Sequence, residues 1–183
     1  MPITRLAECP AKTWKNGLGR TRELAIHPPG AGMDDFLWRV SVAEVESAAP
    51  FSAFPGVDRV IALLEGDGFT MALDDGRSHA LTTPCAPFAF PGESGVQVTL
   101  AGSPSRDFNL MLRRGRVRGG VEAWHTAGAR QADAGTVLVY CVRGRIDTDE
   151  GELRAGDAWR PGTGTPVLRE GTLALAVRVE PTT

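Results

Sequence analysis

The feature that most limits what this chain can fold into is an alternation of apolar and polar residues in short runs. In residues 36–45, the apolar Trp38 and Val40 alternate with Arg39 and Ser41, which is the two-residue period of a β-strand. Similar runs recur at spacings of about 8–12 residues, and the sequence has 22 Gly and 13 Pro to separate them. Helical periodicity is scarce. The pattern predicts an all-β fold, either a sandwich or a barrel.

A faint internal repeat predicts two halves. Residues 60–66 and 137–144 each read as an apolar strand that ends at a turn glycine, and each is followed by a short strand, a turn and a Pro-Gly corner. We therefore expect two tandem barrels in one compact chain. The first barrel is predicted over residues 1–115, and a second, smaller barrel with a shared interface is predicted over residues 116–183.

Charge and hydropathy argue against nucleic acid and membranes as partners. The net charge is −2, and the arginine-rich run at residues 113–118 is interpreted as a solvated connector between the halves. No apolar run approaches the ~20 residues of a membrane span, and the first residues lack the apolar region of a signal peptide. The three cysteines show no CxxC spacing, so we expect reduced thiols and a cytoplasmic location.

The histidines do not form a metal-binding pattern. His27, His79 and His125 stand apart, and none has a second ligand at His-x-His spacing or at the spacing of one helical turn. A structural or surface role is therefore favoured for each, and the sequence predicts no metal and no cofactor. A G-x-S-x-G nucleophile motif is also absent from the sequence.

Polar side chains share faces on three predicted strands, opposite larger apolar side chains. If the apolar faces pack outward between sheets, these polar faces line the mouth of the first barrel. The pairs that share a face are Thr21 with Glu23, Arg39 with Ser41, and Asn109 with Met111.

An arginine at such a mouth is suited to grip a carboxylate through two parallel hydrogen bonds. Arg39 is the first candidate, and Arg59, which follows a Phe-Pro-Gly loop, is the second. The alternative is that Arg39 and Glu23 form an ordinary structural ion pair, and the sequence leaves both interpretations open.

Four ordered blocks resemble the HutD/Ves family. The first is W-K-N-G-L-G-R-T-R-E at residues 14–23, which is similar to the family's opening W-x-N-G-x-G-x-T-x-E, and the others lie at residues 38–43, 50–59 and 107–111. The resemblance covers roughly residues 12–114, and the second half is similar mainly to generic cupins. It implies an RmlC-like bicupin fold, that is, two tandem cupin jelly-roll barrels, without a catalytic metal.

The resemblance also implies a link to histidine utilisation. Family membership would mean binding of a pathway intermediate such as urocanate or formylglutamate, with a role in limiting the output of the pathway. The positions that match the family and that we expect at the ligand are Trp14, Asn16, Thr21, Glu23, Arg39, Ser41, Phe51, Phe54, Arg59 and Asn109.

The favoured function is a metal-independent binding protein for a small anionic metabolite. Arg39 and Arg59 are predicted to hold its carboxylate, Asn16 and Asn109 to orient it, and the aromatic residues of the set to close the mouth. The alternative is a metal-independent isomerase or hydrolase with Glu23 as general base. A metallo-cupin oxygenase with scattered ligands is a third hypothesis. Cupins often dimerise, so a homodimer is left open.

Overall fold

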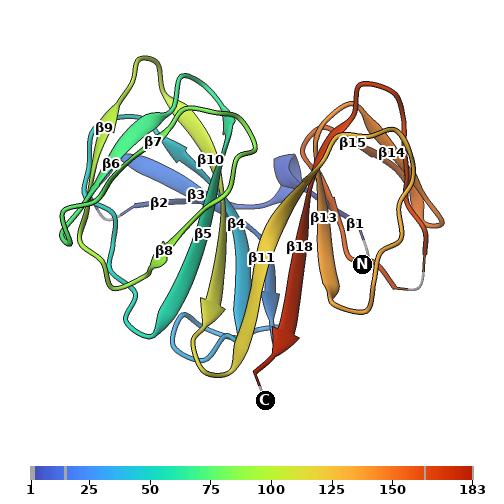
Figure 1. Cartoon of the computed structure of the whole chain (residues 1–183), viewed down its shortest axis with the longest axis horizontal. Helices are drawn as coiled ribbons and strands as arrows, with labels where there is room; N and C mark the ends of the chain where they lie inside the picture. The colour runs from blue at the N-terminus through green and yellow to red at the C-terminus, as the bar shows by residue number, and fades with distance from the viewer. Residues whose placement is uncertain (1–2, 15, 163, 183) are drawn as a thin grey trace. The chain divides into compact units, whose positions relative to one another are not determined.

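The computed structural model describes residues 3–14, 16–162 and 164–182 of the 183-residue chain. These residues form β-strands and turns (Figure 1), and their only helix is the 3-10 turn Leu6–Glu8. The predicted all-β fold is confirmed. Within this part of the chain, no helix has the length and hydropathy needed to span a membrane.

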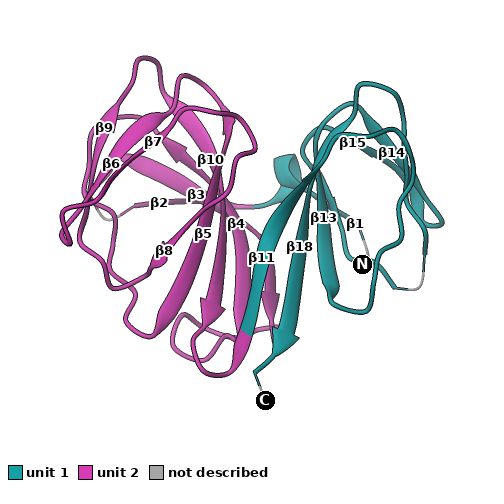
Figure 2. Ribbon diagram, in the orientation of Figure 1, with its two compact units in different colours: residues 1–9, 118–183 teal, residues 10–117 magenta. Residues whose placement is uncertain are grey.

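The chain divides into two compact units, coloured separately in Figure 2. Unit 2 comprises residues 10–117, and unit 1 comprises residues 1–9 together with residues 118–183. The beginning of the chain was expected in the first barrel. It lies in unit 1 because β1 (Ile3–Arg5) pairs with β16 (Asp157–Trp159). A pairing between the two ends of a sequence leaves no trace in local alternation, so sequence patterns could not locate it.

Unit 2 consists of two sheets that share one core. The first sheet has six strands in the order β2 (Ala11–Thr13), β3 (Gly19–His27), β4 (Trp38–Val45), β10 (Ser105–Arg113), β5 (Val57–Glu65) and β8 (Phe88–Pro91). The second has three, in the order β7 (Ser78–Leu81), β6 (Phe69–Leu73) and β9 (Val96–Leu100). Side chains from both sheets, such as Ile61 and Leu63 of β5 and Phe69 and Met71 of β6, pack in one apolar cluster.

Unit 1 repeats this plan with different strands. One sheet has the order β1, β16, β13 (Thr136–Arg143), β18 (Leu173–Pro181) and β11 (Val117–Trp124). The other has the order β12 (Gly128–Ala129), β17 (Val167–Leu168), β14 (Arg145–Thr148) and β15 (Gly151–Arg154). Its core holds large apolar side chains from both sheets, among them Trp124, Ile146, Leu153 and the fully buried Trp159.

The expectation of closed jelly-roll barrels needs correction. In the described residues, no sheet closes on itself: the six-stranded sheet begins at the three-residue β2 and ends at the four-residue β8. Closure of a barrel requires hydrogen bonding around the whole circumference. Each unit is instead a pair of open sheets that face one another across an apolar core.

Gly68 provides a test of the turn that joins β5 to β6. Its φ of +80° lies in the region that favours glycine, and a Cβ at this position would overlap the backbone carbonyl oxygen of Leu81. Gly76 has a φ of +87° but open space around it. We expect Gly68→Ala to lower the free energy of unfolding by at least about 3 kcal/mol, because clash and strain add. Gly76→Ala should cost about 1 kcal/mol, from strain alone.

Urea unfolding followed by circular dichroism measures both changes. Equal losses in the two variants would show that the close approach of β7 to Gly68 does not limit this turn.

Candidate functional site

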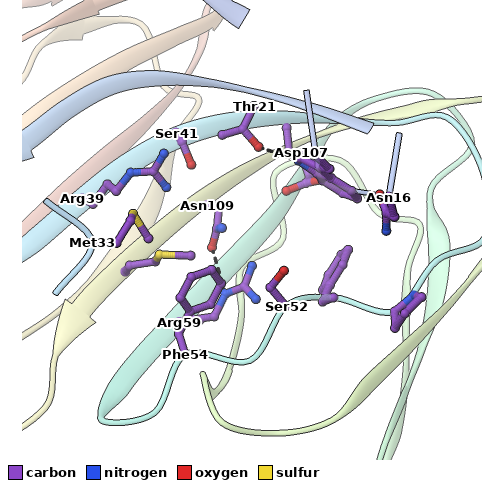
Figure 3. Close-up of a pocket in the computed structure, with 15 residues that line it drawn as sticks. Asn16, Thr21, Met33, Arg39, Ser41, Ser52, Phe54, Arg59, Asp107 and Asn109 are labelled. Carbon is purple, nitrogen blue, oxygen red and sulfur yellow. Dashed lines mark hydrogen bonds between the residues drawn. The ribbon is translucent and has the colours of Figure 1, made fainter. Parts of the chain in front are cut away.

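Unit 2 contains a cavity of about 630 Å³. Its walls are side chains from β3, β4, β5 and β10 and from the loops that precede β3, β4 and β5. Figure 3 shows these side chains, with arginine, asparagine, serine and aromatic groups gathered around one space. A cavity of several hundred Å³ with a few polar groups in an apolar wall is typical of small-molecule sites.

The strand register arranges the polar residues of the cavity wall in rows. Side chains two residues apart share a face of a strand, and neighbouring strands align these side chains across the sheet. The rows, each running from β3 or β4 to β5, are Arg39–Met111–Arg59, then Glu23–Ser41–Asn109–Ile61, then Thr21–Ala43–Asp107–Leu63. Successive rows are about 7 Å apart along the strands.

Arg59 is a buried cation in this wall, with only 5% of its surface exposed. Its guanidinium carbon lies 5.4 Å from the ring centres of Phe51 and Phe54 and 4.9 Å from that of Phe90. Its Nε donates a hydrogen bond of 3.4 Å to Oδ1 of Asn109 (Figure 3). No ion pair within 4.0 Å links Arg59 to an acidic group of the described residues. Burial lowers the pKa of Arg59 to about 10, against an opposing effect of Asp107.

Arg39 lines the cavity but already has a partner. Its Nε donates a hydrogen bond of 2.7 Å to Oε2 of Glu23, and the two groups form an ion pair. The structural ion pair that the sequence left open is therefore present. Arg39 is 8% exposed, whereas the Glu23 side chain is 32% exposed. Glu23 lies outside the cavity lining, so of this pair only Arg39 reaches the cavity.

Asp107 is the acidic group of the cavity. The residue is 1% exposed, and its Oδ2 atom is buried without a hydrogen bond to any described residue. Burial raises the pKa of Asp107 to about 7, against the opposing effect of the Arg59 charge. Because ionisation leaves a buried oxygen unsatisfied, the neutral form of this carboxyl is favoured. Asp107 can therefore exchange a proton near neutral pH.

A hydrogen bond to β3 holds the aromatic side of the cavity in place. Nε1 of Trp14 donates a hydrogen bond of 2.8 Å to Oγ1 of Thr21, and the Trp14 ring packs edge-on against Phe51 at 6.2 Å. Asn16 lines the cavity too, but its Oδ1 accepts a hydrogen bond of 3.0 Å from the backbone N–H of Leu18. The amide N–H₂ group of Asn16 and the second lone pair of its Oδ1 are left to orient a ligand.

Nine of the ten residues predicted at the ligand line this cavity, and Glu23 does not. The lining also contains Met111, which was expected on the same face as Asn109, and five residues that were not named as ligand contacts, namely Met33, Ala43, Pro50, Ser52 and Asp107. Asp107 could have been found from the sequence, because it lies two residues before Asn109 on the same strand face. The loop residues Met33 and Pro50 carry no such signal.

The ligand donors for a metal ion do not gather in one place. Across residues 3–14, 16–162 and 164–182, no three His, Cys, Asp or Glu side chains form a group that could hold a metal ion. His27 stacks on Trp38 at 5.7 Å and His79 stacks on Phe88 at 3.8 Å. Burial raises the pKa of the Cys141 thiol to about 12, which makes it a poor thiolate ligand or nucleophile.

The model of the HutD family matches residues 6–175. The chain belongs to the HutD family. The resemblance seen in the four sequence blocks is thereby confirmed, and it extends into the second half of the chain.

Relatives of this HutD-family chain match along most of their length. It is 35% identical over 147 residues to the "uncharacterized 21.2 kDa protein in hutC 3'region" of Pseudomonas putida, covering 80% of this chain and 76% of the relative. It is 38% identical over 169 residues to the protein Ves of Cronobacter sakazakii, covering 90% of both chains.

Solved structures support the same fold. HutD from Pseudomonas fluorescens SBW25, solved in a formate condition, superposes with a TM-score of 0.85 at 28% identity, covering 99% of this chain and 98% of that one. A cupin 2 conserved barrel domain protein from Leptotrichia buccalis superposes with a TM-score of 0.61 at 9% identity, covering 92% of both chains. The second likeness shows that the fold of this HutD-family chain is cupin-like.

Asp107 gives a test of the electrostatics of the cavity. Its pKa is raised in the folded chain, to about 7, from about 3.9 in an unfolded chain. Its contribution to stability is therefore complete below about pH 4 and is lost as the pH rises through about 7. We expect Asp107→Asn to gain at least about 1 kcal/mol in free energy of unfolding, relative to the unmodified chain, between pH 5 and pH 8.

Urea unfolding at the two pH values measures this gain. Asp67→Asn is the matched control, because the hydrogen bond from Ser103 lowers the pKa of exposed Asp67 and leaves it ionised at both pH values. A constant difference between Asp107→Asn and the unmodified chain would place the Asp107 pKa near its ordinary value.

Proposed function

We propose that this chain binds a small anionic metabolite in the cavity of unit 2, without using a metal, and that it thereby modulates histidine utilisation in the cytoplasm. The observation that carries the proposal is the Arg59 guanidinium, which is buried in the wall of a 630 Å³ cavity and lacks an acidic partner within ion-pair distance among the described residues.

Burial of a charged group costs free energy. A guanidinium loses its hydration on burial and needs compensation from hydrogen bonds or an opposite charge. The hydrogen bond to Asn109 is long, and the three phenylalanine rings supply a weaker cation–π attraction. A carboxylate in the cavity would supply the missing charge and accept parallel hydrogen bonds from the guanidinium.

The remaining lining favours a ligand with a polar end and an apolar or planar body. Ser41, Ser52 and Asn109 offer hydrogen-bonding groups, while Trp14 and Phe51 offer flat apolar surface. Arg39 contributes positive charge at reduced strength, because Glu23 is bound to it. A monocarboxylate or a dicarboxylate of metabolite size fits this distribution.

The choice of pathway rests on the family. HutD relatives include a Pseudomonas putida protein in the hutC 3' region, and the resemblance points to histidine utilisation. We therefore propose urocanate and formylglutamate as the ligands to test first. Urocanate would place its planar ring against the aromatic side, and formylglutamate would offer two carboxylates to the two arginines.

A metal-independent enzyme is the second candidate, and one observation favours it. Asp107 lies in the cavity wall, and its pKa is raised by burial to about 7, a value suited to general acid–base chemistry at neutral pH. Glu23, the base expected from the sequence, is engaged by Arg39 outside the lining. If the chain turns over a small carboxylic acid, Asp107 is therefore the better placed base.

Substitution of Arg59 tests the binding proposal. We expect Arg59→Gln to weaken the binding of urocanate or formylglutamate at least tenfold, because a charge-assisted hydrogen bond contributes about 1.5–3 kcal/mol. Arg39→Gln should weaken binding less, since Glu23 already takes part of its charge. Calorimetric titration measures both affinities.

Arg154→Gln is the control, because Arg154 is exposed, belongs to unit 1 and is not part of the cavity lining. Equal affinity in Arg59→Gln and Arg154→Gln would remove Arg59 from the site and with it the main support for the proposal.

The enzyme alternative makes a separate prediction. Incubation of the purified chain with either acid, followed by mass spectrometry, should show turnover that Asp107→Asn abolishes and Arg154→Gln retains. Turnover lost in Glu23→Gln but kept in Asp107→Asn would assign the base to Glu23. If no product forms from either acid, the binding function is favoured over catalysis of these substrates.

A further inference from the structure

The carboxyl group of Asp107 is the one buried acid of the cavity wall, and its Oδ2 atom makes no hydrogen bond to a described residue. We propose that an anionic ligand binds together with a proton on Asp107, so that the neutral carboxyl is a hydrogen-bond donor of the binding site. The inference rests on the proposed function, since it concerns the same cavity and the same class of ligand.

The register places Asp107 close to the position of the bound anion. The Arg59 head group reaches Asn109, whose Oδ1 accepts the bond from Nε, and Asp107 lies one row further along β10. One row is about 7 Å. A carboxylate bound to the guanidinium would therefore lie on the order of one row, about 7 Å, from Asp107. A ligand with a second polar group that extends along β10 would touch it.

The groups around Asp107 offer it little compensation. Its neighbours across the sheet are Ala43 on β4 and Leu63 on β5, and Thr21 on β3 continues the row. None of the three carries a charge. The facing sheet contributes apolar side chains to the core of this unit, Phe69 and Val98 among them.

The charged groups in the neighbouring rows of the same face are Arg59 on β5 and the ion pair of Arg39 and Glu23 on β4 and β3. The loop residues of the described lining carry no group that titrates near neutral pH; they are Trp14, Asn16, Met33, Pro50, Phe51, Ser52 and Phe54. Arg59 is thus the main charge that stabilises an ionised Asp107. A bound anion would use that same guanidinium and would repel the Asp107 carboxylate.

The protonation of Asp107 and the affinity for an anionic ligand are therefore coupled, and the direction of this coupling follows from the charges. Without ligand, burial holds the pKa of Asp107 near 7. A nearby anion raises the pKa of a carboxyl group further, so the complex holds the proton over a wider pH range. Below about pH 6 Asp107 is already neutral, and its protonation no longer makes the affinity depend on pH. Above about pH 7 each binding event takes up a proton, and affinity falls by up to tenfold per pH unit.

Formylglutamate is the probe for this coupling, because its two carboxylates and its formamide do not titrate between pH 6 and pH 8.5. Calorimetric titrations at both pH values, and at pH 8 in two buffers that differ in ionisation enthalpy, give the affinity and the number of protons taken up. For the unmodified chain, we expect at least a fivefold loss of affinity at pH 8.5 and proton uptake at pH 8.

Asp107→Asn should bind with the same affinity at both pH values, take up no proton, and exceed the unmodified chain at pH 8.5, because its amide is neutral and still donates. Asp67→Asn is the control and should behave as the unmodified chain does. Should Asp107→Asn fail to fold, carboxyl carbon NMR of aspartate-labelled, unmodified protein is the second measurement. One resonance should titrate near pH 7 and move to higher pH with formylglutamate.

The outcomes separate the two proposals. Formylglutamate binding with no pH dependence and no proton uptake, or an Asp107 resonance that the ligand does not move, overturns this inference and leaves the proposed function standing. Failure of the unmodified chain to bind formylglutamate at either pH overturns the inference and counts against the proposed function as well.

Discussion

The buried guanidinium of Arg59 is the constraint around which unit 2 is organised. A charge removed from water has to be compensated inside the fold, and the surroundings of Arg59 supply this only in part. Three aromatic rings and one amide oxygen surround the group. The nearby acid, Asp107, is itself desolvated and shares the same low-dielectric space. The interior thus holds an electrostatic arrangement that an incoming anion can complete.

How far the sequence could predict this site depends on which residues are considered. Alternation along the strands correctly placed Arg39, Ser41 and Asn109 on one face, because a two-residue period has a direct geometric meaning. The same period marks Asp107, which was overlooked. The alternation could not decide whether Glu23 forms an ion pair with Arg39, because this pair depends on side-chain conformations and on the register of β3 against β4.

The fold shows the same division between local and non-local information. Local patterns predicted the strands and the all-β class, but not the pairing of β1 with β16 or the open edges of the sheets. Sheet closure depends on hydrogen bonds between strands distant in sequence, which no short segment specifies. The loop residues Met33 and Pro50 of the cavity were missed for a related reason, because their positions depend on where the strands lead the chain.

The two units share one architecture, two sheets around a core, but differ in what fills the space between the sheets. In unit 1 the space between the sheets is filled by Trp124, Ile146, Leu153 and Trp159. In unit 2 the corresponding interior is apolar over β6 and β9 but polar along β4, β5 and β10. A cavity is present beside these polar strands of unit 2. Composition of the interior, more than topology, therefore separates a unit with a site from a unit without a described one.

The hydrogen bond between Trp14 and Thr21 has a practical consequence. It fixes an indole ring in the cavity wall, edge-on to Phe51, whereas the other three tryptophans of the chain lie outside the lining. Indole emission responds to nearby polarity and charge. The cavity thus carries a built-in optical reporter of its own occupancy, which needs no attached dye.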